Sequence, residues 1–313
     1  MENKIISIQE EVKKAIVGKD EIIRRVMAVI IAGGHILLED IPGVGKTTLA
    51  LAFSKAMDLK FNRIQFTPDV VPSDITGFTV YNRQTGAFEY KEGAAMCNVL
   101  LADEINRTSS KTQSALLEVM QEGRITVDGQ PHAVPEPFLV IATQNPIGTA
   151  GTQMLPEAQL DRFMVQLSIG YPDEEAQVNI LKDRQVSDPL KQVCPVADRA
   201  DILALRKVCR EVFVHDKIYR YISRLCSETR EHPLIRLGVS PRGALAMCGL
   251  AQSWALMHGR GYVIPGDVQD IFFDVCRHRI ILNGKAQLQN KNEFRILQEV
   301  MGAVQSPKAA EWI

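Results

Sequence analysis

Residues 40–47 read Asp-Ile-Pro-Gly-Val-Gly-Lys-Thr and connect an apolar run at 36–38 to a helix-forming run at 49–56. A strand, a glycine-containing turn and Lys-Thr at a helix start form the layout of a phosphate-binding loop. The glycines let backbone N–H groups approach an anion, and the helix adds the positive end of its dipole. We expect Lys46 to neutralise nucleotide phosphates, Thr47 to ligate Mg²⁺, and the nucleotide to contact Pro42, Gly43, Val44, Gly45, Lys46, Thr47 and Thr48.

One position departs from the common loop pattern, which begins with glycine where this chain has Asp40. The same stretch is also compatible with a glycine turn that leads into an ordinary helix. The rest of the chain must therefore decide between a nucleotide site and a turn.

Length and composition place the chain among globular proteins. At 313 residues it exceeds one typical domain, and 46% hydrophobic with 23% charged residues permits a large buried core. The formal net charge of -1 provides no global attraction to nucleic acid or to an anionic membrane. Two domains are the default expectation.

Cysteine usage and hydropathy indicate the cytoplasm. The six cysteines form no C-x-x-C pair, which suits free thiols in a reducing compartment. The first 14 residues lack the apolar centre of a signal peptide. The longest apolar run, residues 26–38, contains two glycines and is shorter than the roughly 20 residues of a membrane helix. We expect no membrane insertion.

The first half of the chain has the pattern of an α/β fold. After a helical region at 5–31 that is interrupted at Gly18, apolar runs alternate with helical segments, which predicts a parallel five-stranded sheet between helices. Two hairpins, at 78–90 and 124–134, interrupt this alternation. Residues 67–77 are too rich in proline and turn residues for a regular element. The expected strands lie at 35–38, 61–66, 99–102, 138–142 and 164–168.

After residue 172 helical periodicity dominates and no strand is predicted. We place a domain boundary in this region, with an α/β nucleotide-binding core at 1–186 and a small all-α lid domain at 187–313. The expected helices span 174–182, 201–213, 216–230, 244–258, 266–278 and 292–304.

Polar side chains follow two of the predicted strands. The run at 99–102 delivers Asp103 and Glu104, and the run at 138–142 leads to Asn145. Ligands in open parallel sheets bind at the carboxyl edge of the strands. There Asp103 would hold Mg²⁺, Glu104 would polarise the attacking water, and Asn145 would position that water. A surface acid pair and a turn-forming asparagine are the alternatives.

Two arginines extend this set. Arg162 follows a short helical stretch just before the last strand, where it could reach the γ-phosphate of a neighbouring subunit as an arginine finger. Arg242 lies in the first turn of a helix that Ser240 caps, against the dipole preference for anions. This mismatch hints at an anionic partner. Solvated surface arginines are the alternative for both.

Taken in this order, the motifs resemble the MoxR family of AAA+ ATPases over nearly the whole chain. The resemblance also includes Gln65-Phe66-Thr67-Pro68-Asp69, and the segments at 101–107, 142–146 and 156–163. It assigns Lys46 and Thr47 to Walker A, Asp103 and Glu104 to Walker B, Asn145 to sensor 1, Arg162 to the finger position and Arg242 to sensor 2. By the same resemblance Val17 and Gly18 contact adenine, and Asp40 is tolerated in the loop.

The resemblance implies a function and partners. Members use ATP with Mg²⁺ and release ADP, form hexameric rings, and commonly work with von Willebrand factor A domain proteins to mature other complexes. The client protein is not identified by the sequence. A nucleic-acid translocase is disfavoured because the 124–134 hairpin has no run of cations or stacked aromatics. A metal-chelatase motor subunit and a non-hydrolysing scaffold are further alternatives.

Overall fold

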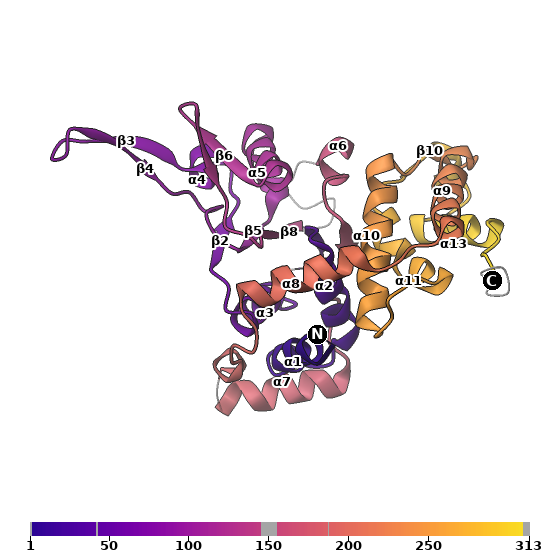
Figure 1. The fold of residues 1–313 in the computed structure, drawn as a ribbon. Coiled ribbons are helices and arrows are strands. Elements are labelled where there is room, and N and C mark those ends of the chain that lie inside the picture. Colours follow the sequence, from indigo (N-terminus) through magenta and orange to yellow (C-terminus); the bar gives the residue numbers. More distant parts are fainter. Residues whose placement is uncertain (1, 42, 145–154, 187, 309–313) are drawn as a thin grey trace.

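The computed structural model describes residues 2–41, 43–144, 155–186 and 188–308. Figure 1 shows an α/β core from which two hairpins project, and a helical C-terminal part on the other side of the molecule. The α/β class with a helical lid region is confirmed.

The core contains a parallel sheet in the order β2-β5-β8-β1-β9, as the sequence predicts in number and direction. Its inner strands are buried on both faces, so they appear in the sequence as apolar runs instead of alternating ones. The strands are β1 (Ile36–Glu39), β2 (Phe61–Gln65), β5 (Val99–Asp103), β8 (Leu139–Gln144) and β9 (Val165–Leu167).

Helices cover both faces of this sheet. Ile36 and Leu38 pack in one hydrophobic cluster with α1 (Glu2–Lys13), α2 (Asp20–Ala32) and α3 (Lys46–Ala56). Leu37 points to the other face and packs in a second cluster with α5 (Ser110–Glu122). The expected helical region at 5–31 is two helices, and the turn between them contains Gly18 at φ 71°.

The two predicted hairpins are present, and they contact each other. β3 (Phe78–Asn82) pairs with β4 (Ala87–Lys91), and β6 (Arg124–Val127) pairs with β7 (Gln130–Ala133). The Tyr90 ring stacks on the His132 ring with centroids 3.8 Å apart. In Figure 1 the β3–β4 ribbon extends far from the core.

The expectation that residues 67–77 hold no regular element is wrong at one place. α4 (Pro72–Thr76) is a short helix with proline at its start, where the missing N–H costs nothing. The Asp74 carboxylate accepts a hydrogen bond from the Val71 N–H at 2.9 Å and closes the first turn. Turn-forming residues here therefore cap a helix.

The C-terminal part is helical, with one correction. β10 (Ile235–Leu237) and β11 (Ile281–Leu282) form a small antiparallel sheet that the sequence analysis missed, because such short strands carry no periodicity. The helices are α7 (Glu174–Val186), α8 (Arg199–Glu211), α9 (Asp216–Glu231), α10 (Pro241–Met257), α11 (Pro265–Cys276), α12 (Gly284–Leu288) and α13 (Glu293–Ala303).

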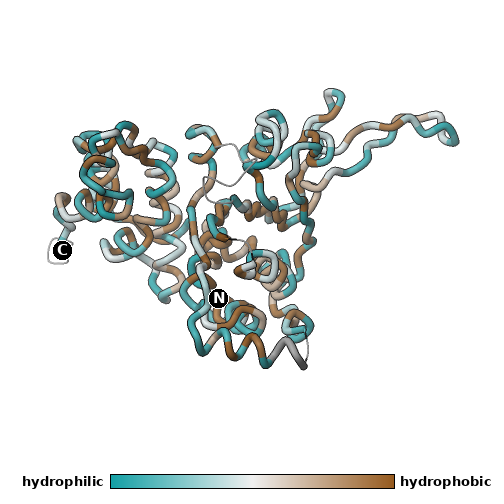
Figure 2. Tube along the Cα trace, turned by 180° about the vertical axis from the view of Figure 1, so that it is seen from behind, coloured by the Kyte–Doolittle hydropathy of each residue, from teal (hydrophilic) through white to brown (hydrophobic). Residues whose placement is uncertain are grey.

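The C-terminal helices pack directly on the core. One hydrophobic cluster runs from α1–α3 into α8–α11, and Figure 2 shows apolar segments along the strands and the helices that face them. On α2, the Ala28 carbonyl accepts from Ser253 Oγ at 2.7 Å and the Ile30 carbonyl accepts from Arg206 Nε at 3.0 Å. The domain boundary at 187 therefore stays a prediction. Among the described residues, every helix is too short or too polar to cross a membrane.

Candidate nucleotide site

The glycine loop lies at the carboxyl end of β1 and leads into α3. Gly43 and Gly45 have φ of 86° and 96°, a region that side-chain-bearing residues rarely adopt. Thr47 and Thr48 follow in the first turn of α3, half-buried, and Val44 is also half-buried. Pro42, the remaining predicted loop residue, lies outside the described residues. This geometry presents backbone N–H groups and a helix N-terminus to one side of the loop.

Lys46 is buried, and its ammonium group donates to the Asp40 carbonyl oxygen at 2.8 Å. Burial lowers the pKa of Lys46, while the carboxylates of Asp40, Asp103 and Glu104 act in the opposite direction. Carboxylates from two different strand ends therefore influence one lysine, as the sequence predicts for the carboxyl edge of a parallel sheet.

Asp103 and Glu104 are joined by a threonine from the neighbouring strand. Thr143 Oγ1 donates to Asp103 Oδ1 at 2.6 Å and accepts from the Glu104 N–H at 2.8 Å. The other Asp103 oxygen forms an ion pair with Arg63 of β2 at 2.7 Å. Asp103 is thus oriented from both sides.

The Glu104 carboxylate is held by an arginine that follows it closely. Arg107 Nη1 lies 2.7 Å from Glu104 Oε2, across the short 3-10 helix η1 (Ile105–Arg107). Glu104 itself has φ 57°, which is uncommon for a residue with a side chain. Such strain concentrates at functional sites. In this conformation the carboxylate is engaged by the protein.

Asp40, the departure from the loop pattern, has a structural role. Its carboxylate is buried and accepts hydrogen bonds from Ser168 Oγ at 2.8 Å and from the N–H groups of Ile169 at 2.5 Å and Gly170 at 3.1 Å. Asp40 therefore ties the start of the glycine loop to the chain that leaves β9.

The predicted adenine contact, Val17 and Gly18, lies near the same segment. Lys19 Nζ donates to the Tyr171 carbonyl oxygen at 2.7 Å, and a Cβ on Gly18 would come within 2.7 Å of the Ala176 side chain. The α1–α2 turn and the glycine loop are therefore both attached to residues 168–176. The adenine contact of Val17 and Gly18 stays a prediction.

Arg162 does not extend into solvent. It is half-buried, and Nη1 donates to the Leu117 carbonyl oxygen of α5 at 2.8 Å. Its Nε is buried and has no partner among the described residues. To act as a finger, Arg162 must leave Leu117.

Arg242 is 80 residues away from Arg162 in the sequence, but its helix contacts the Arg162 segment. It is exposed in the first turn of α10, whose cap Ser240 donates to both carboxylate oxygens of Asp161 at 3.0 and 2.8 Å. The structure thus brings together the segments that carry the two arginines. The remaining candidate, Asn145, lies outside the described residues.

The residues present fit a nucleotide with Mg²⁺. The loop offers N–H donors and an ammonium group, and Thr47 and Asp103 offer hard oxygen ligands. The described residues contain no group of three or more His, Cys, Asp or Glu side chains that could hold a metal ion. This donor set agrees with Mg²⁺, which takes few protein ligands and completes its shell with phosphates and water.

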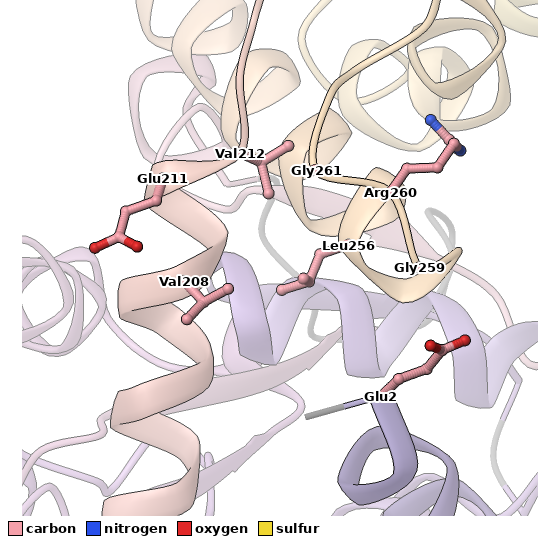
Figure 3. A pocket seen from close by; sticks show the side chains of 8 residues that line it. All are labelled: Glu2, Val208, Glu211, Val212, Leu256, Gly259, Arg260 and Gly261. Atoms are coloured by element: carbon pink, nitrogen blue, oxygen red, sulfur yellow. The ribbon is translucent and has the colours of Figure 1, made fainter.

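The described residues also enclose two cavities, and the residues of the glycine loop line neither of them. One of about 300 Å³ lies between Glu2, the end of α8 and the Gly259–Gly261 turn (Figure 3), and its Arg260 is already paired with Asp267. The larger, about 1240 Å³, lies between the ends of β1 and β8, the short helix α6 (Glu157–Leu160) and the lid. Its wall includes Asp161 and Ser240 and adjoins the arginine segments.

Comparison with known proteins identifies the family. Residues 35–165 match the model of the ATPase family associated with various cellular activities (AAA), and residues 227–300 match an AAA lid domain. Chaperone MoxR1 of Mycobacterium tuberculosis is 39% identical over 95% of this chain and 81% of its own length. The chain belongs to the MoxR family of AAA+ ATPases.

Other relatives support this assignment. The YeaC protein of Bacillus subtilis is 46% identical over 95% of this chain and 93% of its own. Protein MoxR of Methylorubrum extorquens is 27% identical over 88% of this chain and 86% of its own length. A crystal structure of a putative ATPase from Cytophaga hutchinsonii superposes with a TM-score of 0.90 at 37% identity, covering 98% of this chain and 96% of that one.

Several residues at this MoxR-type site were not predicted. Thr143 could have been found, because it directly follows the strand predicted at 138–142, as Asp103 follows the strand predicted at 99–102. Arg63 and Arg107 could not, because their ion pairs depend on strand order and on the turn after β5.

Proposed function

We propose that this chain hydrolyses ATP within a hexameric ring of identical subunits and uses the cycle to remodel or mature client protein complexes. The observation that carries the proposal is the position of Thr143. It ties Asp103 to Glu104 at the sheet edge where both carboxylates influence Lys46. Walker-type sites require this combination of cation, metal ligand and base.

Each residue then has a defined role. Lys46 exchanges the Asp40 carbonyl for phosphate oxygens, and Thr47 and Asp103 hold Mg²⁺. When bound, Mg²⁺ supplies neutralisation of phosphate charge. Glu104 leaves Arg107 and accepts a hydrogen bond from the attacking water. Asn145 orients that water, and Val17 with Gly18 contacts the adenine.

The two arginines belong to the neighbouring subunit's nucleotide. Asp40 binds the segment at the carboxyl end of β9, whereas Asp161 precedes the amino end of that strand. The three residues of β9 alone span about 10 Å, at roughly 3.3 Å per residue. Because the two arginine-bearing segments and the Asp40-bound segment lie at opposite ends of β9, we infer that Arg162 and Arg242 complete the next site in a ring.

Substitution of Glu104 by Gln tests hydrolysis. This substitution removes the base but keeps the shape, so we expect ATP turnover to fall at least 100-fold, in line with the 10²–10⁴ range for general bases, while ATP affinity remains. Glu118→Gln on the exposed face of α5 is the matched control. Chelation of Mg²⁺ should stop turnover in the wild type. Unchanged turnover in Glu104→Gln would refute the mechanism.

Partners follow from the projecting hairpins and the family. Tyr81 and Phe88 are 52% and 75% exposed on the β3–β4 ribbon, which favours contact with a protein. Arg124 and Lys91 are each paired with a glutamate, which weakens the case for nucleic acid. We infer a cytoplasmic protein that acts with a von Willebrand factor A domain partner. Turnover stimulated by single-stranded DNA, and lost with salt, would favour a translocase instead.

A further inference from the structure

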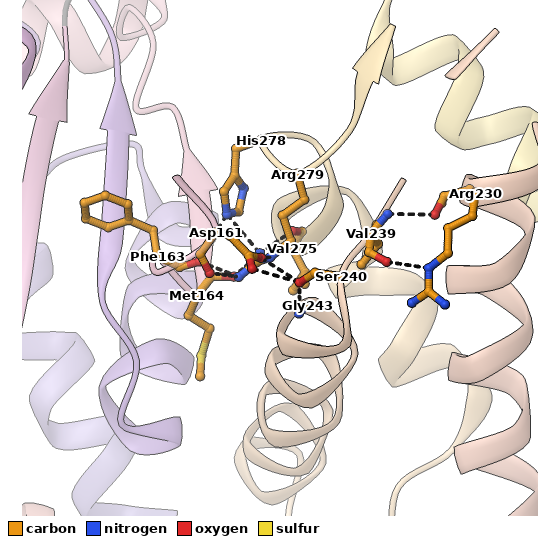
Figure 4. Close-up of polar contacts among 11 residues, drawn as sticks. Asp161, Phe163, Met164, Arg230, Val239, Ser240, Gly243, Val275, His278 and Arg279 are labelled. Atoms are coloured by element: carbon orange, nitrogen blue, oxygen red, sulfur yellow. Dashed lines mark hydrogen bonds and ion pairs between the residues drawn. The ribbon is translucent and has the colours of Figure 1, made fainter. Parts of the chain in front are cut away.

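A buried polar network joins the lid to the segment that carries Arg162 (Figure 4). Arg279 follows α11 and its side chain is only 2% exposed. Its Nε donates to Asp161 Oδ1 at 2.8 Å, and Nη1 donates to the Met164 carbonyl at 3.0 Å. Nη2 donates to the carbonyls of Asp161 at 3.2 Å and Phe163 at 2.5 Å. One guanidinium thus fixes the backbone on both sides of Arg162.

The same aspartate also fixes the helix that carries Arg242. Ser240 Oγ donates to Asp161 of the core and accepts from the Gly243 N–H at 3.2 Å. One hydroxyl group therefore both caps α10 and attaches this helix to the core. The preceding residue is held as well, because Arg230 Nε donates to the Val239 carbonyl at 2.8 Å. Asp161, which directly precedes Arg162, therefore binds both Arg279 and the cap of the helix that carries Arg242.

The packing around the network leaves no room for a side chain at Gly243. A Cβ on Gly243 would lie 2.8 Å from Arg279 Cδ and 2.5 Å from Val239 Cγ1. The first turn of α10 therefore lies directly against the Arg279 side chain. A displacement of Arg279 would therefore also shift the helical turn that contains Arg242.

Charge balance makes Asp161 and Arg279 a pair. His278 lies beside Arg279, and burial, followed by the charge of Arg279, lowers the pKa of His278 well below its usual value. His278 is thus neutral, and Asp161 balances the buried guanidinium. Removal of Asp161 would leave Arg279 as an unpaired buried charge.

We propose that Asp161 and Arg279 are positioning residues that hold Arg162 and Arg242 in one unit, so that both reach the nucleotide of the neighbouring subunit together. This inference rests on the proposed function. The geometry supports it more than a purely stabilising role, because four acceptors of Arg279 lie on the residues on either side of Arg162. One of them, the Asp161 carboxylate, also binds the cap of α10. A displacement of 1 Å can cost about 100-fold in rate.

Arg279→Lys is the informative variant, because lysine keeps the charge but cannot reach four acceptors. We expect hydrolysis to fall about 100-fold at unchanged ADP affinity in a chain that still folds. Its thermal stability should be lower than that of the wild type, because buried carbonyl groups lose their donor. Arg220→Met is the matched control, since Arg220 also pairs with an aspartate of the lid but is 70% exposed. It should hydrolyse ATP like the wild type.

Mixed rings show where Arg279 acts. A Lys46→Ala chain has a disabled loop but an intact Asp161–Arg279 pair, so mixing it with Arg279→Lys should restore hydrolysis well above the sum of the separate chains. A mixture of Lys46→Ala with Glu104→Gln, both damaged in the same site, should restore none.

The results separate the proposals. Wild-type hydrolysis by Arg279→Lys, or a loss that mixing does not restore although ADP still binds, would overturn the positioning role. If Arg279→Lys does not fold, Ser240→Ala is used instead, because it removes only one hydroxyl group. Wild-type hydrolysis by this variant, or a loss that mixing does not restore, would again overturn the positioning role. A wild-type chain that assembles but does not hydrolyse ATP would instead refute the proposed function, and the inference with it.

Discussion

Asp40 shows how a single residue can depart from a motif and still support it. Its carboxylate satisfies two backbone N–H groups and one hydroxyl of the segment after β9. A glycine at this position would leave those groups without a partner. The start of the loop is therefore fixed by hydrogen bonds to the segment after β9.

Asp40→Ala should lower the free energy of unfolding by roughly 2–3 kcal/mol, since buried N–H groups would lose their acceptor. Nucleotide affinity should fall too, because the Asp40 segment also binds Lys46. Urea unfolding and nucleotide titration measure both effects. The exposed Asp69→Ala is the control, and equal stability of the two variants would contradict this role.

At the residue scale the sequence predicts positions better than contacts. Lys46, Asp103 and Glu104 were predictable because strand ends in a parallel sheet share one edge. The resting partners of Glu104 and Arg162 were not. Leu117 approaches Arg162 only through the tertiary fold, and Arg107 reaches Glu104 only across the 3-10 turn after β5. Side-chain contacts of this kind produce no periodic pattern in the amino-acid sequence.

Among the elements, β1 is joined to its neighbours by a half-buried histidine at its start. His35 Nδ1 accepts from the Val140 N–H at 3.0 Å, and Nε2 lies 3.0 Å from the Met120 carbonyl. Both contacts suit the neutral ring. Burial lowers the pKa of His35 to about 4.

A pH dependence follows with a defined sign. Below about 6.5 the unfolded chain binds a proton at His35 that the folded chain takes up only near pH 4. Stability should therefore fall as pH falls through this window, by up to about 1.4 kcal/mol per pH unit for one proton. Urea unfolding of His35→Gln between pH 6.5 and 4.5 should show a shallower slope. Equal slopes of stability against pH in the two chains would refute the role of His35, since the two chains share all other titratable groups.

Element prediction succeeded where periodicity or turn chemistry is strong. Asp128-Gly129 predicted the β6–β7 hairpin, and the apolar runs predicted all five strands of the sheet. It failed for α4 and for β10–β11, which are too short for a period to emerge. The stacking of Tyr90 on His132 joins elements far apart in sequence, and local patterns do not reveal it.

On the scale of the whole molecule, the lid is attached to the core in two ways. A continuous hydrophobic cluster joins α2 to α8 and α10, and the Asp161–Arg279 network joins the lid to the start of β9. Sequence analysis predicted a helical lid but neither attachment, because both depend on how distant helices pack. The Asp161–Arg279 network and the segment that Asp40 binds lie at opposite ends of β9.

The central claim is that each hydrolysis site is shared by two subunits. The most direct test is turnover per chain at saturating ATP, measured against chain concentration while light scattering records the assembly state. We predict that a monomer binds ATP through Lys46 but turns it over slowly, and that turnover per chain rises with the ring fraction by about 10³-fold or more. Constant turnover per chain, down to concentrations where only monomer is present, would contradict the account.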